Sequence, residues 1–263
     1  MDRTERREET LEGTSFLIVG PPLSGKTRSL DSLPGRLIHF NFELEGYQAL
    51  RKPFIVVPTL RDFWTTKKQI EKTVVVDCAA NLPGLIGEGK EARVEATKIT
   101  NLIKDCNTLP DHLGDFDAIS IDSLAPFGIA VLDFVIALNG RSVPQIQDYR
   151  DALYKTKEIL FKLQSLKKIF VLLAHFQTEK DEITGRARQV PQVWGSNLPQ
   201  DIVKWLSTTF QAVVASTGKG DVEYKWNTKP EGLVESLGSR KWDNLPKFIP
   251  QNFEALFKMV GGQ

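Results

Sequence analysis

The chain has 263 residues, of which 41% are apolar and 25% are charged, and its formal net charge is +1. This length and composition are typical of one globular α/β domain with a sizeable core. Because the net charge is near zero, no global basic field favours nucleic acid, and any such binding would need a local basic patch or loop.

The N-terminal segment, MDRTERREETLEG, is highly charged and contains no apolar stretch. It predicts a flexible arm over residues 1–13, and a signal peptide or membrane anchor is not expected. Residues 14–263 then form one domain. No apolar run approaches the roughly 18–20 residues that cross a bilayer, so we expect no membrane association and a cytoplasmic protein, in the host cytoplasm if the gene is viral.

Short apolar runs along the chain predict buried strands, and apolar spacing between them predicts helices. The expected strands are 15–19, 36–42, 54–57, 73–77, 118–122, 168–174, 210–215 and 223–227, and the expected helices are 60–72, 91–107, 145–166 and 253–260. Segment 178–200 is polar and aperiodic, which favours a long functional loop. Strands that alternate with helices predict an α/β fold, with a mainly parallel twisted sheet covered by helices on both faces.

The first strand leads into GPPLSGKT, residues 20–27, which matches the phosphate-binding pattern G-x-x-x-x-G-K-[ST] at every fixed position. The glycines let backbone N–H groups converge on phosphate oxygens, the lysine neutralises β- and γ-phosphate charge, and the threonine hydroxyl binds Mg²⁺. We therefore expect ATP with Mg²⁺ to be held by Gly20, Pro21, Pro22, Leu23, Ser24, Gly25, Lys26, Thr27 and Arg28.

A second metal ligand should be a carboxylate at the end of an apolar strand. Asp122 ends the run AISID, and Asp77 ends VVVD in the same style. Asp122 is the preferred ligand because it lies later in the chain, before a long helix and the strand KIFVLLA. Asp77 remains the alternative.

Hydrolysis also needs a group that orients water. Glu43 and Glu45 follow the strand LIHFNF, so either carboxylate could reach the γ-phosphate, and Glu43 is preferred because it comes first. His175 ends KIFVLLAH and could sense the γ-phosphate. We expect Glu43, Glu45, His175 and Lys26 to include the catalytic groups.

The order of these motifs, GPPLSGKT, then Glu43, IDSL and LLAH before a polar loop, resembles the RecA-like branch of P-loop ATPases. It resembles in particular phage-encoded RecA-like proteins of single-strand annealing and recombination, over roughly residues 14–245. The resemblance implies that Lys26 and Thr27 hold phosphate and Mg²⁺, that Asp122 supports Mg²⁺, that Glu43 positions water and that His175 is the sensor.

The same resemblance implies partners. A loop over residues 178–193 would bind single-stranded DNA through Lys180, Arg186 and Arg188, with Trp194 available to stack on a base. RecA-like ATPases also reach into a neighbouring subunit's site, and Lys229 and Arg240 are the candidates for such trans-acting groups in a homo-oligomer.

Two functions follow. The first is a DNA-stimulated ATPase that acts on single-stranded DNA in phage recombination, annealing or replication. The alternative is a nucleotide-dependent loader or switch that acts on a protein partner such as a helicase. A small-molecule kinase is disfavoured, because residues 178–193 offer only two arginines for a lid.

Overall fold

The computed structural model describes residues 13–44, 46–57, 73–78, 113–180, 185–194, 198–218 and 220–261. The expected arm over 1–13, apart from its last residue, and the helices expected at 60–72 and 91–107 lie outside the described residues. Glu45 also lies outside them.

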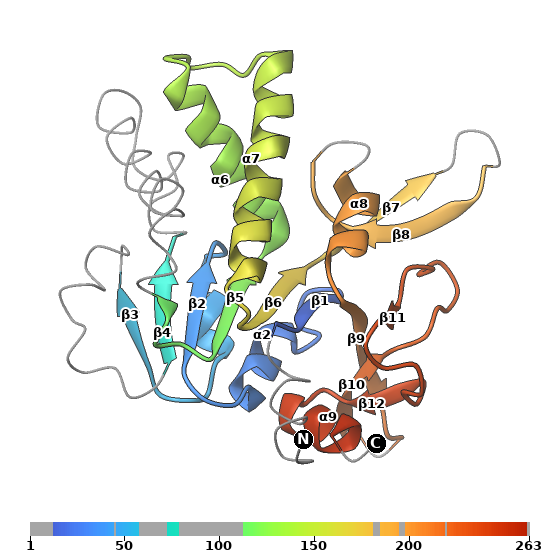
Figure 1. Ribbon diagram of the computed structural model, residues 1–263. Helices are drawn as coiled ribbons and strands as arrows, with labels where there is room; N and C mark the ends of the chain where they lie inside the picture. The colour runs from blue at the N-terminus through green and yellow to red at the C-terminus, as the bar shows by residue number, and fades with distance from the viewer. Residues whose placement is uncertain are drawn as a thin grey trace.

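One large sheet organises the described part of the chain, in the strand order β12–β10–β9–β1–β6–β5–β2–β4–β3, with β11 added beside β9 (Figure 1). Its parallel strands are β1 (Ser15–Val19), β2 (Leu37–Asn41), β3 (Phe54–Val57), β4 (Thr73–Asp77), β5 (Ala118–Asp122), β6 (Ile169–Ala174) and β9 (Thr208–Ser216). Antiparallel strands extend one side: β10 (Val222–Asn227), β11 (Gly238–Ser239) and β12 (Phe248–Pro250).

Helices cover both faces of this sheet. One face packs against α6 (Leu124–Leu138), α7 (Ile146–Ser165) and α8 (Leu198–Trp205). The other packs against the short α2 (Lys26–Ser29), the 3₁₀ turn η1 (Leu30–Ser32) and α9 (Phe253–Val260). A further 3₁₀ turn, η2 (Gly46–Ala49), follows β2. The predicted fold class, a mainly parallel sheet with helices on both faces, is confirmed.

The central strand β1 shows why a continuous apolar run forms a buried strand here. Side chains of a strand alternate between the two faces, so a strand covered on both sides needs apolar residues throughout. Leu17 and Val19 point into the core under α6 and α7, and Phe16 and Ile18 point into the core under α9. The Phe16 ring packs edge-on against Phe253 of α9, with ring centroids 5.2 Å apart.

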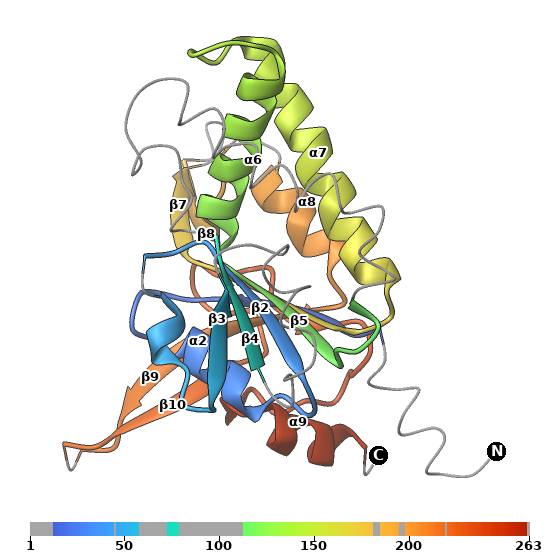
Figure 2. The same cartoon turned by 90° about the vertical axis from the view of Figure 1, so that its left-hand side faces the viewer.

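Three regions differ from the predictions: helix α6, the segment of β7 and β8, and the short strands β11 and β12, which were not predicted. Helix α6 was not predicted, and with α7 it forms a helical hairpin that projects beyond the sheet (Figures 1 and 2). Its sequence, LAPFGIAVLDFVIAL, is apolar on almost every side and includes proline and glycine, so it lacks the 3.6-residue spacing that marks an amphipathic helix.

The expectation of a loop over 178–200 was wrong for much of that segment. Strands β7 (Phe176–Lys180) and β8 (Ala187–Pro191) form an antiparallel hairpin, and α8 follows it. Glu179 and Arg188 lie opposite each other in this hairpin, 3.1 Å apart. Cross-strand charge pairs stabilise a hairpin whose faces are too polar to show an apolar alternation.

The remaining predicted elements agree with the structure to within two residues at each end, and the C-terminal helix agrees at both ends. Among the described residues, no helix combines the length and the apolar character that a membrane crossing requires. The cytoplasmic location stays a prediction.

Candidate active site

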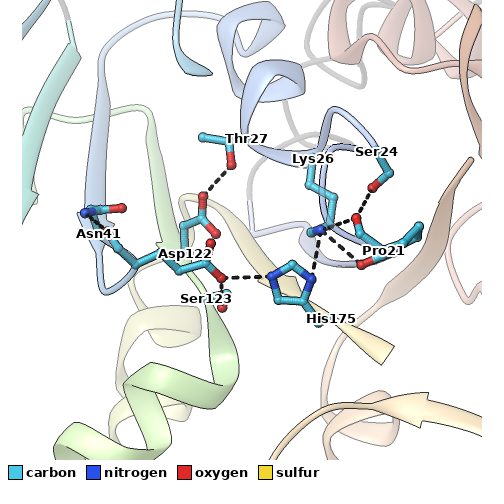
Figure 3. Close-up of polar contacts among 10 residues, drawn as sticks. Pro21, Ser24, Lys26, Thr27, Asn41, Asp122, Ser123 and His175 are labelled. Carbon is cyan, nitrogen blue, oxygen red and sulfur yellow. Dashed lines mark hydrogen bonds and ion pairs between the residues drawn. The ribbon is translucent and has the colours of Figure 1, made fainter. Parts of the chain in front are cut away.

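The candidate groups gather where four neighbouring parallel strands end. Strand register aligns Val19 of β1 with Ala174 of β6, and Asn41 of β2 with Asp122 of β5. The residues that follow these ends therefore meet at one edge of the sheet, where open α/β sheets place their ligands (Figure 3).

The loop from Gly20 to Thr27 turns tightly at its two glycines. Gly25 adopts φ +81°, and a Cβ there would lie 2.5 Å from Gln251 Oε1. A Cβ at Gly20 would lie 2.8 Å from Ser24 Oγ and 2.9 Å from the carbonyl oxygen of Ala212. Both positions therefore require glycine for the backbone to pass, as a phosphate-binding loop demands.

Lys26 is buried inside this loop. Its Nζ donates to the carbonyl oxygens of Gly20 at 3.0 Å and Pro21 at 2.9 Å, and lies 3.4 Å from His175 Nδ1. Burial lowers the pKa of the Lys26 ammonium, and the charges of Asp122 and Glu43 oppose this shift. The ammonium thus sits between the loop and two carboxylates, where a phosphate group would compensate its burial.

Thr27 and Asp122 form a direct pair. Thr27 Oγ1 donates to Asp122 Oδ2 at 2.5 Å, and Asp122 is only 1% exposed. Burial, with a further contribution from the Glu43 charge, raises the pKa of Asp122 to about 6. A hydroxyl and a carboxylate oxygen are ligands that Mg²⁺ prefers, so Thr27 and Asp122 fit the metal that the loop implies.

Asp77, the alternative metal ligand, lies at a different position. Its Oδ1 accepts a hydrogen bond from Asn41 Nδ2 at 3.0 Å, and Asn41 Nδ2 also donates to the Glu43 carbonyl oxygen at 2.7 Å. The hydroxyl of Thr27 instead donates to Asp122. The geometry favours Asp122 as the ligand.

Glu43 is held by two side chains. Its Oε1 accepts from Ser123 Oγ at 2.5 Å and lies 3.0 Å from His175 Nε2. The hydrogen bond from His175, with help from Ser123, lowers the pKa of Glu43, so the carboxylate is ionised at neutral pH. The side chain is still 29% exposed, which leaves it accessible to water.

His175 joins the loop to Glu43. A neutral imidazole that donates from Nε2 to Glu43 keeps Nδ1 free to accept from Lys26, which matches both distances. Of the four catalytic candidates, Glu43, His175 and Lys26 are therefore in one polar network, while Glu45 lies outside the described residues.

Ser123 belongs to the motif IDSL, but the sequence predicted no role for it, and it did not single out Asn41. Ser123 fixes Glu43, and Asn41 fixes the Glu43 backbone. Both are fully buried polar residues at or just after the end of an apolar strand. That position is a signal that could have found them, since buried polar groups need partners.

The nucleic-acid candidates lie on the hairpin β7–β8, which begins one residue after His175 (Figure 1). Lys180 is exposed at the end of β7. Arg186 Nη2 lies 3.6 Å from Glu235 Oε1, and Arg188 is paired with Glu179. All three cations are on the same projecting segment.

Trp194 does not lie with them as a free stacking surface. Its ring packs on Tyr149 of α7, with centroids 6.1 Å apart, and a Cβ at Gly128 of α6 would lie 2.5 Å from its Nε1. The suggestion that Trp194 stacks on a base was wrong, because the indole fills the space that Gly128 leaves between the helices.

The trans-acting candidates lie outside the polar network. Lys229 Nζ donates to the Asp243 carbonyl oxygen at 3.2 Å, and an Arg240 nitrogen donates to the Lys204 carbonyl oxygen. Both residues are exposed. One chain does not test a contact with a neighbour, so their role stays a prediction.

Comparison with known proteins places the chain in a family. A family model described as "AAA domain" matches residues 12–234. Two solved structures are similar at 11% identity: a KaiC-like protein from the hyperthermophilic archaeon Pyrococcus horikoshii OT3, and the flagellar accessory protein FlaH from Methanocaldococcus jannaschii. The first similarity covers 91% of this chain and 85% of that chain with a TM-score of 0.47, and the second covers 94% and 90% with a TM-score of 0.43. No curated protein sequence matches this chain.

Proposed function

This chain belongs to the AAA domain family, and from that premise we propose that it hydrolyses ATP and couples hydrolysis to single-stranded DNA. The processes would be recombination, annealing or replication, as in phage-encoded RecA-like ATPases. One observation carries the proposal: His175 contacts both Lys26 and Glu43, and the hairpin β7–β8 with its three candidate cations begins at the next residue.

In the proposed reaction, Lys26 exchanges its two carbonyl partners for β- and γ-phosphate oxygens. Glu43 accepts a proton from the attacking water while Ser123 and His175 keep the carboxylate oriented. Thr27 and Asp122 would hold Mg²⁺, which neutralises phosphate charge when it is bound. In this proposal, catalysis comes from two positioned groups, the buried Lys26 ammonium and the ionised Glu43 carboxylate.

The hairpin supplies the surface for DNA. Lys180, Arg186 and Arg188 lie along it, and the ion pairs of the two arginines are partly or largely exposed. Exposed ion pairs contribute only about 0–1 kcal/mol, so phosphates of a nucleic-acid strand can replace their carboxylate partners. Residues 176–191 hold three basic and three acidic side chains, so DNA binding here would depend on these three cations and not on a net positive charge of the segment.

A homo-oligomer completes the proposal. Among the described residues the side chains of Lys229 and Arg240 donate to backbone carbonyls, and both residues are exposed, so either side chain could turn to a neighbouring subunit's phosphates. An ATPase rate per subunit that rises with protein concentration would support assembly. A rate that stays constant over the whole range would contradict trans-acting residues.

The test is the ATPase rate with and without single-stranded DNA, at two salt concentrations. The variant Lys180→Ala/Arg186→Ala/Arg188→Ala should lose the stimulation, and its DNA affinity should depend less on salt, by a log–log slope of about 2 for three phosphate contacts. The matched control carries Arg150→Ala, Lys155→Ala and Lys162→Ala on α7. Equal loss in the control, or DNA binding that ignores salt in the parent protein, would overturn the proposal.

A protein partner is the second candidate, and one observation favours it. The tip of the α6–α7 hairpin exposes Leu138 by 61%, Val143 by 69% and Ile146 by 90%. Clustered apolar side chains at a projecting tip are typical of a docking surface. If a protein such as a helicase is the target, that partner should raise the ATPase rate and DNA should not. Replacing Leu138, Val143 and Ile146 with serine should then remove the increase in rate.

A further inference from the structure

The tip of the α6–α7 hairpin is a fixed turn with apolar side chains on its outside. The Asp148 carboxylate is fully buried there, and its Oδ1 accepts from Asn139 Nδ2 and Arg141 Nη1, each at 2.7 Å. Its Oδ2 accepts from the backbone N of Gln145, also at 2.7 Å. Hydrogen bonds to an ionised carboxylate are strong, so they hold the chain between the two helices in one conformation. The apolar side chains around this turn are exposed by 61%, 69% and 90%: Leu138, Val143 and Ile146.

This arrangement is the reverse of an ordinary surface turn. Polar groups usually face water and apolar groups face the core. Here the polar groups of the turn bind the buried Asp148, and the apolar side chains face water. Neighbouring exposed apolar side chains mark a contact surface, and a turn that is already fixed loses little conformational entropy when it docks. The tip is therefore suited to insert into an apolar groove of another molecule.

A groove of about 480 Å³ runs along α8, between β8 and the segment that contains β11. Cavities of roughly 300–1,000 Å³ enclose drug-sized molecules, so this α8 groove can take the side chains of a short turn. Its apolar lining residues are buried or partly buried and so form its floor: Val190, Pro191, Pro199, Val203, Leu206 and Leu237. The described residues that line the groove include none from α6 or α7.

The rim of the α8 groove is charged, but ion pairs within the fold balance most of its charges. These pairs are Arg188–Glu179 at 3.1 Å, Lys204–Asp201 at 2.9 Å and Glu235–Arg186 at 3.6 Å. An apolar centre inside a polar rim is the usual anatomy of a protein–protein interface. An uncharged apolar element therefore fits this groove better than a charged ligand does.

We propose that the α6–α7 tip of one copy of this chain docks in the α8 groove of a second copy. The tip brings apolar side chains and no free charge, because its Arg141 is paired with the buried Asp148. The tip lies at the end of the hairpin that projects beyond the sheet, whereas α8 packs on the sheet (Figures 1 and 2). Tip and groove are thus separate surfaces, and each copy of the chain offers both.

A second copy is the occupant that the chain itself supplies. A foreign protein would need its own apolar element of matching shape, whereas every copy of this chain carries a tip for each groove. The inference rests on the homo-oligomer of the proposed function and names its contact. Arg240 also lines the groove, so a docked copy lies against one of the two side chains expected to act on a neighbour.

This contact joins two different surfaces and is therefore heterologous. Repeated heterologous contacts close into a ring or extend into a filament. Assembly through the tip and the groove should consequently proceed beyond two copies, and loss of either surface should stop it.

The experiment is sedimentation velocity of the full chain at rising concentration, with and without Mg²⁺ and ATP. The parent protein should form species heavier than one chain. The tip variant Leu138→Ser/Val143→Ser/Ile146→Ser should lose these species. The matched control is Ile129→Ser/Tyr154→Ser, which replaces exposed apolar residues on the same two helices and should assemble like the parent.

The groove variant is Gln200→Trp/Ser236→Trp. Both residues are exposed and line the groove, so the two indoles should fill it without entering the core. This variant should also lose the heavier species, and melting temperatures equal to that of the parent would show that both variants fold. A mixture of the tip and groove variants should form a dimer and nothing larger, because each supplies the surface that the other lacks and the two remaining surfaces are altered.

The outcomes separate this contact from the proposed function. If the parent assembles and either variant assembles equally well, the contact is overturned while the homo-oligomer stands. Loss of assembly in the tip variant alone, or a mixture that stays monomeric, also overturns it. If the parent stays a single chain under every condition, the contact and the homo-oligomer both fail and the tip is left to a different protein, whereas ATP binding by one chain is unaffected.

Discussion

Replacing Asp122 with asparagine should stabilise the nucleotide-free protein at neutral pH, although Asp122 is the expected Mg²⁺ ligand. The side chain is buried, lies near the Glu43 carboxylate and accepts a hydrogen bond from Thr27 Oγ1. Asparagine keeps an oxygen that can accept that hydrogen bond and removes the buried negative charge. The fold thus bears a cost at this residue that a bound cation or protonation of the carboxylate would relieve.

The size of the effect follows from the pKa of Asp122, which burial raises from 3.8 to about 6. Between these values the folded state binds more protons than the unfolded state, so stability falls as pH rises through this window. At about 1.4 kcal/mol per unit, the full cost above pH 6 is about 3 kcal/mol. At pH 4, close to the unfolded-state pKa of 3.8, the folded carboxyl is protonated and the unfolded one is partly protonated, so most of the cost has disappeared.

Urea unfolding from pH 4 to pH 8, without Mg²⁺ or nucleotide, measures this cost. We expect Asp122→Asn and the parent protein to be similar at pH 4, and the variant to be more stable by about 3 kcal/mol at pH 7. The control is Glu158→Gln on α7. Hydrogen bonds from Lys162 and Lys155 lower the pKa of Glu158, so this substitution should reduce the stability at pH 7 and not increase it. A difference for Asp122→Asn that stays constant from pH 4 to pH 7, or a variant less stable at pH 7, would refute the reasoning.

Three further predictions concern the phosphate-binding loop and Glu43, the proposed proton acceptor. Glu43→Gln should reduce single-turnover hydrolysis by about 10²- to 10⁴-fold and keep ATP affinity, because only the proton acceptor is lost; a larger effect from Glu45→Gln would reverse the assignment. Lys26→Ala should abolish tight nucleotide binding in calorimetry, because the cation that contacts the phosphates is lost. The melting temperature should not change, since burial of the ammonium is costly to the nucleotide-free fold. Normal ATP affinity in this variant would contradict the assignment of the phosphate-binding loop. Gly25→Ala should destabilise the fold by about 1–3 kcal/mol in urea unfolding, because the left-handed φ of +81° and the 2.5 Å approach of Gln251 Oε1 leave no room; unchanged stability would disprove the strain.

The fold was predictable where one residue property decided the outcome. Strands such as β1 and β6 are buried on both faces, so their whole sequence is apolar and flanked by loop residues. Helix α6 is also apolar almost throughout, and periodicity does not separate it from a strand or a loop. The hairpin β7–β8 is stabilised by pairing across strands, which a pattern read along one strand does not contain.

The site was predictable for a similar reason. In a parallel sheet the carboxyl ends of the strands share an edge, so polar residues after successive strands, such as Glu43, Asp122 and His175, are brought together by topology alone. The contacts of Tyr224 and Gln251 with the loop depend on how β10 and β12 fold back beside β9. Tyr224 and Gln251 are distant in sequence from Gly25, so no local sequence pattern predicts their contact with the loop.

The polar network also bears on whether DNA or a protein partner is the target. His175 contacts Lys26 and Glu43 through its ring, and its carbonyl oxygen accepts from Gln192 N at 2.7 Å, so both ends of the β7–β8 hairpin meet at this residue. A γ-phosphate that draws Lys26 away from the loop carbonyls changes the charge beside the His175 ring. Helix α6 also begins at the site, because its N-cap Ser123 donates to Glu43, but its apolar tip lies at the far end of the helix. In the proposed mechanism nucleotide state would therefore act directly on the β7–β8 hairpin, and this supports the proposal of DNA over a partner at the apolar tip.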